Sequence, residues 1–447
     1  MLLRKIIVLG AGESGVGAAI LAKKKGFDVF VSDFAKIKEK YKNVLLKFEI
    51  DFEEEKHTES IILNADEIIK SPGIPDKAAI IKAIELKGIP VIDELEFAAR
   101  FTKAVKICIT GSNGKTTTTL LTYHILKNAG LNVGLGGNVG KSFALQVAEN
   151  DYDYYVLEVS SFQLDRMYDF KAEIAILTNI TPDHLDRYNY QFDNYIQSKF
   201  RIVQNQTAKD AFIFCADDEV TMKNIGNYQL EAKQYSFSTL KTISGEGAFL
   251  LNENIILTIN TKKTYMELET LALQGRHNIY NSMAASVASK ILNVRKSIIK
   301  NSLSSMENIE HRLEFIAKVH GIEFINDSKA TNVNSTWYAL ECMTKPTIWI
   351  VGGQDKGNDY SSLKQLVKSK VKAIVCLGVD NSKIIKEFTG IVPVIIETKS
   401  AKEAVDNAYY LAESDDVVLL SPCCSSFDLF ENFEDRGIQF KNAVNEL

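Results

Sequence analysis

A short glycine-rich loop holds the residues best suited to chemistry on phosphates. Gly111-Ser112-Asn113-Gly114-Lys115-Thr116 follows an apolar run, Val105–Thr110, and precedes a helical pattern over Thr116–Asn128. Glycines let backbone N–H groups turn towards phosphate oxygens, and a helix N-terminus adds a positive field. Lys115 would neutralise phosphate charge, and Thr116 would place its hydroxyl on Mg²⁺.

The spacing of this loop departs from the usual GxxxxGK[ST]. Ile109 stands where that pattern has its first glycine, so only GxxGKT remains. The other interpretation is a plain glycine-rich turn. Gly-Lys-Thr at the start of a helix, directly after a buried strand, favours the phosphate site.

Side chains that could bind a metal or move a proton follow two further strand-like runs. Glu158 ends one run, and a carboxylate at a strand end beside a phosphate loop is a typical Mg²⁺ ligand. His184 lies in the loop after the other run, between Asp183 and Asp186. This position predicts a functional histidine, with the two acids orienting or capping.

Lys199 lies in a helical, partly apolar stretch, Tyr195–Phe200. Its composition predicts a surface lysine. Only a lysine removed from water, with a lowered pKa, could serve as a reactive amine.

A second glycine loop stands near the N-terminus. Gly10-Ala11-Gly12-Glu13-Ser14-Gly15 fits GxGxxG directly after the strand-like run Lys5–Gly10, and Asp33 ends the next strand. This pattern is a dinucleotide fingerprint, but any nucleotide diphosphate could use the same loop and acid. Glu13 would lie near the phosphates and counts against a dinucleotide. Tight packing of strand on helix is the structural alternative.

The elements that must position these residues alternate between strand and helix, which predicts an α/β fold with mainly parallel sheets. We expect three domains, at residues 1–94, 95–307 and 308–447. Polar alternation over Tyr235–Leu271 predicts antiparallel ribbons within the second domain. Further strands are expected at Asp28–Ser32, Glu67–Lys70, Tyr154–Glu158, Ile174–Thr178, Ala211–Cys215, Glu323–Asn326, Thr347–Val351, Ala373–Leu377 and Asp416–Leu420.

Composition narrows the class of protein. The 447 residues include 46% hydrophobic and 24% charged residues, with a net charge of -5, which suits a globular protein of two to four domains. The charge argues against nucleic-acid partners and membrane insertion. Six scattered cysteines predict reduced thiols, and the apolar run at the N-terminus is too short for a signal peptide. We therefore expect a cytoplasmic protein.

Taken together, these motifs resemble the Mur ligase family, which also includes folylpolyglutamate synthetase. The resemblance covers essentially the whole chain. It is carried by the GxxGKT loop, Glu158-Val159-Ser160-Ser161, Asp183-His184-Leu185-Asp186, Gly275-Arg276-His277-Asn278 and His311-Arg312. It implies a Rossmann-like N-terminal domain, a central P-loop ATPase-like domain with a parallel sheet, and a C-terminal Rossmann-like α/β domain.

Two segments refine the resemblance within the family. Ile325–Asn332 (INDSKATN) and Leu420–Gly437, with its SSFD and NFEDRG motifs, are similar to the member that adds D-glutamate to UDP-N-acetylmuramoyl-L-alanine in peptidoglycan synthesis. No DNPR-like motif is visible, which counts against the member that adds diaminopimelate or lysine. The resemblance implies ATP as co-substrate, two Mg²⁺ ions, an acyl-phosphate intermediate and a monomer.

The resemblance also implies roles for individual residues. Lys115, His184 and Lys199 would be catalytic, and Lys199 matches a lysine that is carbamylated in the family. The metal ligands would be Thr116, Glu158, His184 and Lys199. ATP would be bound by Gly111, Ser112, Asn113, Gly114, Lys115, Thr116, Thr117, Asn278, Arg312, Asp327 and Lys329. The UDP substrate would be bound by Gly12, Glu13, Ser14, Asp33, Ser71, Gly73, Asn138, Ser160, Gln163 and His184. D-glutamate would be bound by Thr331, Lys356, Ser426 and Phe433.

One departure from the family concerns the uracil contacts. Phe34-Ala35 follow Asp33 where other members can have small polar or basic residues.

Three other functions are compatible with parts of the pattern. An NAD-dependent oxidoreductase would use GxGxxG and Asp33 but leaves the Gly-Lys-Thr loop unexplained. A P-loop switch or binding module lacks a guanine-specifying NKxD. A sister ligase of the same family, or a folylpolyglutamate-type ligase, would take another amino acid.

Overall fold

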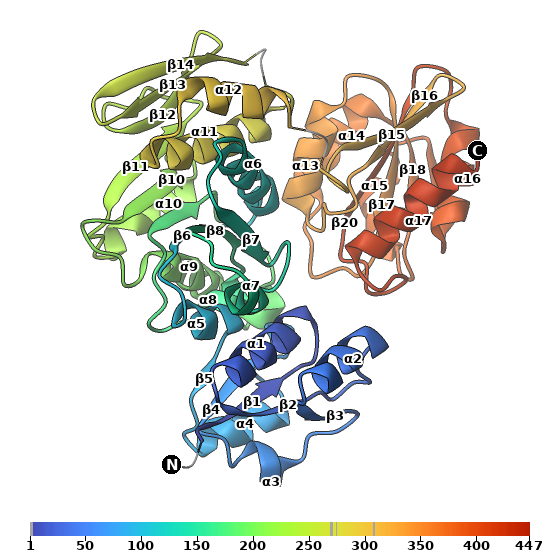
Figure 1. The fold of residues 1–447 in the computed structure, drawn as a ribbon. Coiled ribbons are helices and arrows are strands. Elements are labelled where there is room, and N and C mark those ends of the chain that lie inside the picture. The colour runs from blue at the N-terminus through green and yellow to red at the C-terminus, as the bar shows by residue number, and fades with distance from the viewer. Residues whose placement is uncertain (1–2, 269–270, 274, 307–308) are drawn as a thin grey trace. The chain divides into compact units, whose positions relative to one another are not determined.

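The computed structural model describes residues 3–268, 271–273, 275–306 and 309–447, which form three sheets (Figure 1). The chain divides into two compact units, Met1–Pro182 with Arg187–Ser305, and Asp183–Asp186 with Met306–Leu447. The first unit holds two of the sheets and the second unit holds the third. The α/β class with parallel-sheet domains is thereby confirmed, whereas the boundary expected at residues 307 and 308 lies outside the described residues.

The first sheet has the order β3-β2-β1-β4-β5, and all its pairs are parallel. Four residues of β1 are fully buried, as expected for a strand covered on both faces. Its strands are β1 (Lys5–Leu9), β2 (Asp28–Ser32), β3 (Asp51–Glu53), β4 (Glu67–Lys70) and β5 (Val91–Ile92). Its helices are α1 (Glu13–Lys24), α2 (Glu39–Lys47), α3 (Glu59–Ile62), α4 (Ala79–Leu86) and α5 (Glu94–Ala99).

The second sheet has the order β14-β13-β12-β11-β10-β9-β6-β8-β7. Its strands are β6 (Val105–Thr110), β7 (Val133–Gly137), β8 (Tyr154–Glu158), β9 (Ile174–Leu177), β10 (Ala211–Cys215), β11 (Lys233–Ser238), β12 (Gly247–Leu251), β13 (Asn254–Ile259) and β14 (Lys262–Glu267). Its helices are α6 (Lys115–Asn128), α7 (Phe143–Glu149), α8 (Ser161–Leu164), α9 (Phe192–Phe200), α10 (Glu219–Asn224), α11 (Arg276–Ile291) and α12 (Lys296–Ser304), with 3₁₀ turns η1 (Leu185–Arg187), η2 (Arg201–Val203) and η3 (Ile225–Asn227).

The antiparallel ribbons predicted over Tyr235–Leu271 are confirmed only for β12, β13 and β14. The prediction is wrong for β11, which runs parallel to both β10 and β12. The physical reason is the connection: a crossover through α10 returns the chain to the same edge of the sheet, so the next strand is parallel. Residues 269 and 270 of the predicted segment lie outside the described residues.

The third sheet has the order β15-β16-β20-β17-β18-β19, and only β15 is antiparallel to its neighbour. Its strands are β15 (Glu314–Val319), β16 (Ile322–Asn326), β17 (Thr347–Gly352), β18 (Val371–Leu377), β19 (Val394–Thr398) and β20 (Val417–Cys423). Its helices are α13 (Val333–Cys342), α14 (Lys364–Lys370), α15 (Ser382–Phe388), α16 (Ala401–Leu411) and α17 (Phe433–Asn445), with one 3₁₀ turn, η5 (Ser361–Leu363).

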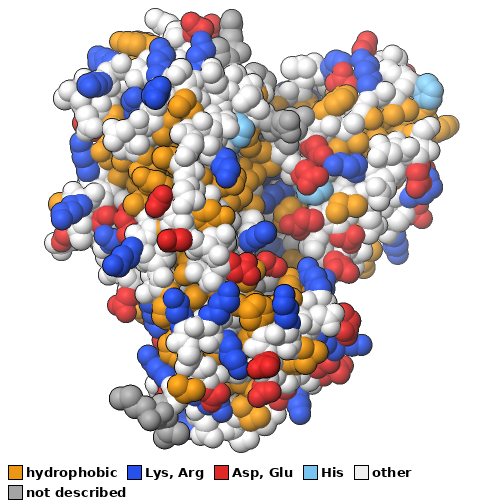
Figure 2. All heavy atoms as spheres, in the orientation of Figure 1, with side chains coloured by type: hydrophobic (Ala, Val, Ile, Leu, Met, Phe, Trp, Pro, Cys, Tyr) orange, Lys and Arg blue, Asp and Glu red, His pale blue; other side chains and the backbone are white. Residues whose placement is uncertain are grey.

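Surface charge agrees with the sequence. On the face drawn in Figure 2, basic and acidic side chains are interspersed within each unit. Among the described residues no helix combines the length and apolarity needed to cross a bilayer.

The topology explains where candidate residues gather. In open parallel sheets, ligands bind at the carboxyl ends of the strands. Most of the predicted site residues lie in loops that follow β1, β2 and β4, then β6, β8 and β9, and finally β16, β17 and β20. Each sheet thus presents one edge of loops rich in polar side chains.

Candidate active site

The loop between β6 and α6 is shaped by two glycines. Gly111 and Gly114 have φ of +144° and +81°. A Cβ atom at Gly111 would lie 1.9 Å from the hydroxyl oxygen of Thr178, and one at Gly114 would lie 2.4 Å from the Oδ1 of Asn281. Any side chain at either position would therefore strain or displace the loop.

Lys115 folds back over this loop. Its ammonium group donates to the carbonyl oxygens of Gly111 and Ser112, at 2.9 Å each. Thr116 and Thr117 follow in the first turn of α6 and are nearly buried. The predicted strand–loop–helix is present, with its cation beside the N-terminus of α6.

The loop after β9 supports the glycine loop from one side. The backbone N–H of Ser112 donates to the carbonyl of Asn179 at 2.8 Å, and its hydroxyl donates to the carbonyl of Thr181 at 2.8 Å. The backbone N–H of Asn113 donates to the Asn179 side chain at 3.0 Å. These bonds fix the backbone of the loop, so the arrangement of its N–H groups is built into the fold.

Glu158 ends β8, as predicted, and its side chain is only 1% exposed. Its carboxylate accepts a hydrogen bond from the side-chain amide of Asn138 at 2.9 Å. Ser160 and Gln163 follow directly and form a capping box at the start of α8. Glu158 and Asn138 are thus brought together, and Ser160 and Gln163 lie shortly after β8 in the chain.

Lys199 corrects a prediction. Composition predicted a surface lysine, but this residue is 1% exposed. Its ammonium donates to the hydroxyl of Thr110 at 3.2 Å and lies 5.2 Å from the centre of the Tyr195 ring. The cause is the orientation of α9. Its buried face includes Tyr195 and Lys199, and this face points towards the end of β6. The lysine is desolvated, which was the condition for a reactive amine.

His184 lies on a strained backbone with φ of +52°. The carboxylate of Asp183 accepts from the backbone N–H of His184 at 2.9 Å, and it lies 3.7 Å from the ring Nε2. The histidine side chain is 35% exposed. Asp183 therefore orients His184, as expected, whereas Asp186 is exposed in η1.

The donor groups do not form an amino-acid-only metal cage. Within the described ranges, no group of three or more His, Cys, Asp or Glu residues is close enough to hold an ion. Mg²⁺ commonly takes one or two protein oxygens together with phosphates and water. The buried Glu158 carboxylate and the Thr116 hydroxyl suit that kind of site.

The first glycine loop meets two other loops at the edge of its sheet. Gly10 has φ of +92°, and a Cβ there would lie 2.5 Å from the Ser71 hydroxyl. The carboxylate of Asp33 accepts from the backbone N–H groups of Ala11 at 2.6 Å and Ala35 at 2.8 Å. The remaining predicted residues of this group lie at the surface or half-buried, at Gly12, Glu13, Ser14 and Gly73.

A polar cluster beside this edge was not predicted. Lys70 is only 2% exposed; its ammonium donates to the carbonyl of Ile74 at 2.7 Å and lies 3.5 Å from the Asp76 carboxylate. Arg166, from the end of α8, binds both Asp76 and Glu85 at 2.8 Å. Burial lowers the pKa of Lys70. Nothing in the local sequence indicates the contacts of Arg166, because they join segments 90 and 81 residues apart in the chain.

Asp327 is the most strongly perturbed acid among the predicted residues of the second unit. Burial raises its pKa to about 7, although Arg312 opposes the shift. Its carboxylate accepts from the Ser421 hydroxyl at 2.9 Å and from the backbone N–H of Leu313 at 3.3 Å. Asp327 therefore links the loop after β16 to the end of β20 and to the start of β15.

The residues predicted for the amino acid lie in the loops of the third sheet. Thr331 and Lys356 are half-buried after β16 and β17, and Ser426 is 2% exposed after β20. The ammonium of Lys329 lies 4.9 Å from the centre of the Phe433 ring. Asn278 belongs to the first unit, where it accepts from the side-chain amide of Asn281 in α11.

Arg436 organises these loops and was missed by sequence reasoning. This α17 residue is 1% exposed, and burial lowers its pKa to about 10. Its guanidinium donates to the carbonyls of Ser328, Gly352 and Cys424 at 2.8, 3.4 and 3.2–3.3 Å, and to the Ser328 hydroxyl at 3.0 Å. One cation thus ties together the loops after β16, β17 and β20.

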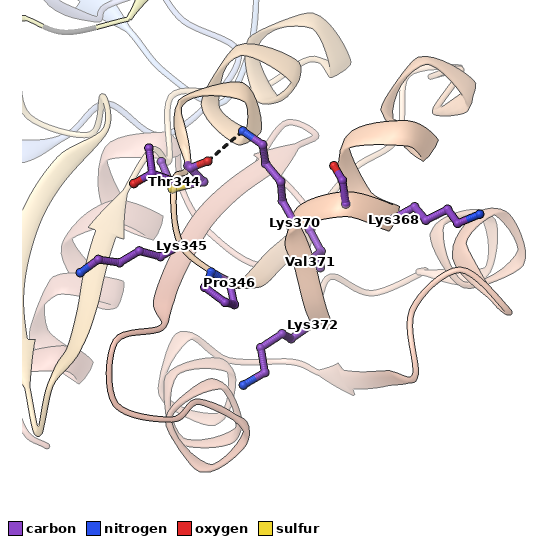
Figure 3. A pocket seen from close by; sticks show the side chains of 9 residues that line it. Thr344, Lys345, Pro346, Lys368, Lys370, Val371 and Lys372 are labelled. Atoms are coloured by element: carbon purple, nitrogen blue, oxygen red, sulfur yellow. Dashed lines mark hydrogen bonds between the residues drawn. The ribbon is translucent and has the colours of Figure 1, made fainter.

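A lysine-lined pocket of about 620 Å³ lies at the amino ends of β17 and β18 (Figure 3). Lys345 and Lys372 form ion pairs with acidic side chains, and Lys370 donates to two backbone carbonyls. Acidic side chains thus pair with two of the four lysines that line this pocket, and the candidate residues of this sheet follow the opposite ends of the strands.

Comparison with known protein families finds three matching models. Residues 5–80 match the MurD N-terminal domain, residues 109–289 the Mur ligase middle domain, and residues 311–424 the glutamate ligase domain of Mur ligases.

Curated relatives match along the whole chain. A protein from Christiangramia forsetii, named UDP-N-acetylmuramoylalanine--D-glutamate ligase, is 56% identical over 99% of this chain and 100% of its own length. A protein of the same name from Bacteroides fragilis is 55% identical over 100% of both chains.

Solved structures share the fold at low identity. The MurC UDP-N-acetylmuramate-alanine ligase from Thermotoga maritima aligns with a TM-score of 0.64 at 18% identity, covering 99% of both chains. The MurF ligase from the same organism, solved in complex with ADP, aligns with a TM-score of 0.61 at 15% identity, covering 100% of this chain and 99% of its own.

Proposed function

The chain belongs to the Mur ligase family, and from that premise we propose that it joins D-glutamate to UDP-N-acetylmuramoyl-L-alanine at the expense of ATP, within peptidoglycan synthesis. The observation that carries the proposal is identity above 50%, over the full length of both chains, to relatives named for this reaction. The phosphate loop and the buried Glu158 beside Asn138 agree with ATP-dependent chemistry.

ATP would bind at the phosphate loop of the first unit. The loop Gly111 to Gly114 would leave room for the phosphates at the N-terminus of α6, where Lys115 supplies a positive charge and Thr116 and Thr117 lie in the first turn. Asn278 belongs to the same unit, and we propose Arg312, Asp327 and Lys329 as further ATP-binding residues.

Two Mg²⁺ ions would be held by Thr116, Glu158, His184 and Lys199. These donors fit the ion, because a buried carboxylate and a hydroxyl leave the remaining positions to phosphates and water. Bound Mg²⁺ would neutralise charge on the transferring phosphoryl group. Glu158 is kept in place by Asn138, which gives that amide a positioning role besides its proposed contact with the substrate.

Lys199 would act as a carbamate. Lys199 is buried, and as a neutral amine its nitrogen could attack carbon dioxide to form an N–C bond with loss of one proton. The product carries a carboxylate in place of an ammonium. The carbamate would therefore bind metal cations, which the ammonium would repel.

The UDP substrate would bind along the edge of the first sheet and onto the second. Gly12, Glu13, Ser14, Asp33, Ser71 and Gly73 would hold the uridine diphosphate, and Asn138, Ser160, Gln163 and His184 would hold the muramoyl side. The convergence of Gly10, Asp33 and Ser71 supports one continuous binding surface.

D-glutamate would bind to the third sheet through Thr331, Lys356, Ser426 and Phe433. Lys356 would pair with a carboxylate of the amino acid. Arg436 holds the loops that carry these residues and adds a buried positive charge that favours an anionic ligand.

The reaction would proceed in two transfers. A carboxylate oxygen of the UDP substrate attacks the γ-phosphorus of ATP, and ADP leaves. The amine of D-glutamate, after losing a proton, then attacks the acyl carbon, and inorganic phosphate leaves. Lys115 would stabilise charge on the transferring group, and His184 or a metal-bound group would accept the proton of the amine. We further propose domains at residues 1–94, 95–307 and 308–447, a monomeric state and a cytoplasmic location.

An amino-acid panel tests the function. The purified protein is given ATP, Mg²⁺ and UDP-N-acetylmuramoyl-L-alanine with D-glutamate, L-alanine or diaminopimelate, and products are identified by mass. We expect phosphate release and a new amide only with D-glutamate. Ligation of another amino acid, or ATP hydrolysis that ignores the amino acid, would contradict the proposal. Lys115→Ala is the control for contaminating activity.

A further inference from the structure

An aromatic ring lies exposed beside the first glycine loop. Phe34 directly follows Asp33 at the end of β2, and it is 73% exposed. Its neighbour across the edge of the sheet is His57, whose ring centre lies 5.7 Å away at an interplanar angle of 42°. Single exposed apolar residues are normal on protein surfaces, so the exposure alone indicates nothing. The place of Phe34 in the sheet is what gives it meaning.

His57 is held in a fixed position by buried polar groups. Its Nδ1 lies 2.7 Å from the hydroxyl of Ser32, which itself donates to Glu53 at 2.8 Å. The other oxygen of Glu53 accepts from the hydroxyl of Thr58, and the first also accepts from the Thr58 backbone N–H at 2.8 Å. Burial lowers the pKa of His57 and favours its neutral ring. The loop after β3 thus presents a rigid, uncharged aromatic ring.

The strand order places this pair where a base would lie. The loops after β1, β2 and β3 are successive along the sheet, because the order is β3-β2-β1. A diphosphate at the N-terminus of α1 and a ribose at Asp33 leave the base beyond Asp33, towards β3. Phe34 and His57 are the aromatic residues of the two loops that border that position.

We propose that Phe34 and His57 form an aromatic platform on which the uracil ring of the UDP substrate stacks. This proposal rests on the proposed function for the identity of the nucleotide. Stacking on an aromatic face tolerates the absence of hydrogen-bond donors. It would replace contacts made by polar or basic side chains, which Phe34-Ala35 do not supply.

Substitutions at residue 34 test the platform through the split between KM and kcat. We expect Phe34→Ala to raise the KM for UDP-N-acetylmuramoyl-L-alanine about tenfold, which corresponds to about 1.4 kcal/mol. The KM values for ATP and D-glutamate, and kcat at saturation, should change less than about twofold. Phe34→Tyr should retain affinity, whereas Phe34→Leu, of similar bulk but without a π face, should lose most of it.

The matched control is Tyr410→Ala, which removes another exposed aromatic ring, at 86% exposure on α16. It should leave every constant unchanged. His57→Ala, compared with His57→Phe, tests the second ring: alanine should weaken the substrate's binding and phenylalanine should preserve part of it. Equal KM values for the wild type and the Phe34→Ala and Phe34→Leu variants would overturn the platform.

Binding of UDP alone separates this inference from the proposed function. The wild type and Phe34→Ala are titrated calorimetrically with UDP in the presence of ADP, which occupies the phosphate loop. A tenfold loss of UDP affinity in a protein that ligates no D-glutamate would support the platform and overturn the function. Normal D-glutamate ligation, together with a UDP affinity that Phe34→Ala does not change, would support the proposed function and overturn the platform.

Discussion

The two glycine loops of the first unit, after β1 and after β6, share a backbone design but differ in their surroundings. Gly10 has φ of +92° and Gly111 has φ of +144°, and a Cβ at either would collide with a neighbouring loop. The β1 loop meets an acid, Asp33, which accepts from the backbone N–H of Ala11. The β6 loop carries a lysine, Lys115, whose ammonium lies on two of the loop's carbonyls.

Burial separates the two loops further. Gly12 and Glu13 are exposed, whereas Ser112 and Thr116 are nearly buried and the loop after β9 encloses the β6 loop. A loop open to solvent and paired with an acid suits recognition of a neutral ribose. An enclosed loop with a cation suits stabilisation of charge that moves during a reaction, because fixed charges act more strongly away from water. Under the proposed function, similar backbone motifs would serve binding in one sheet and chemistry in the other.

The largest expected effect comes from removing the cation of the enclosed loop. Lys115→Ala should lower kcat for ligation on the order of 10³-fold, because the loop would lose the cation proposed to stabilise the transferring phosphoryl group. Affinity for UDP, measured by calorimetry with ADP present, should not change. A variant that kept its kcat would show that the two loops do not differ in chemistry as described.

The second-largest effect is expected from substitution of Lys199. Lys199→Met fills the same buried space, and we expect kcat to fall on the order of 10²-fold because the proposed carbamate is lost as a metal ligand. Lys103→Met, at an exposed lysine before β6, is the control. Carbon-13 NMR after equilibration with labelled bicarbonate should show a carbamate signal in the wild type and none in Lys199→Met. A wild type without that signal would contradict the carbamate.

One glycine substitution in each loop tests whether the β6 loop binds ATP and the β1 loop binds the UDP substrate. Gly111→Ala should raise the KM for ATP roughly 30-fold, about 2 kcal/mol, and Gly10→Ala should raise the KM for the UDP substrate by a similar factor. Each should leave the other KM nearly unchanged. Gly226→Ala, where a Cβ meets no atom within 4 Å, is the control. If both variants weakened the same substrate, the assignment of one loop would be wrong.

The smallest effect is expected at the acid of the open loop. Asp33→Asn keeps the shape but weakens the bond from Ala11, and the KM for the UDP substrate should rise about fivefold, near 1 kcal/mol. Asp51→Asn, at an exposed acid at the start of β3, should have no effect. If Asp33→Asn lowered kcat as far as Lys115→Ala does, Asp33 would have a role beyond positioning the ribose and the loop.

Local patterns predicted the elements that carry this comparison. The bounds of β6, β8 and β10 agree with the sequence prediction, because buried parallel strands are continuous apolar runs. Short or polar strands such as β3 and β15 were not predicted, since three residues, or a half-buried edge, give little periodicity. The parallel direction of β11 depends on its crossover, which periodicity does not encode.

The site residues also divide into those that local sequence patterns indicate and those that they do not. Lys115, Thr116 and Glu158 could be predicted as candidates because the patterns that mark them are local in the chain. The burial of Lys199 depends on how α9 packs, and the contacts of Arg166 and Arg436 join segments up to 108 residues apart. No local pattern reports such contacts, so sequence reasoning misplaced the first residue and missed the other two.

Arg436 makes the third sheet dependent on its own last helix. Three strand-end loops share one guanidinium, which α17 supplies. A variant without that guanidinium would keep the hydrogen bonds of the phosphate loop, whereas the loops after β16, β17 and β20 would lose their common partner. Under the proposed function, we expect such a variant to bind nucleotide and to fail at the amino-acid step.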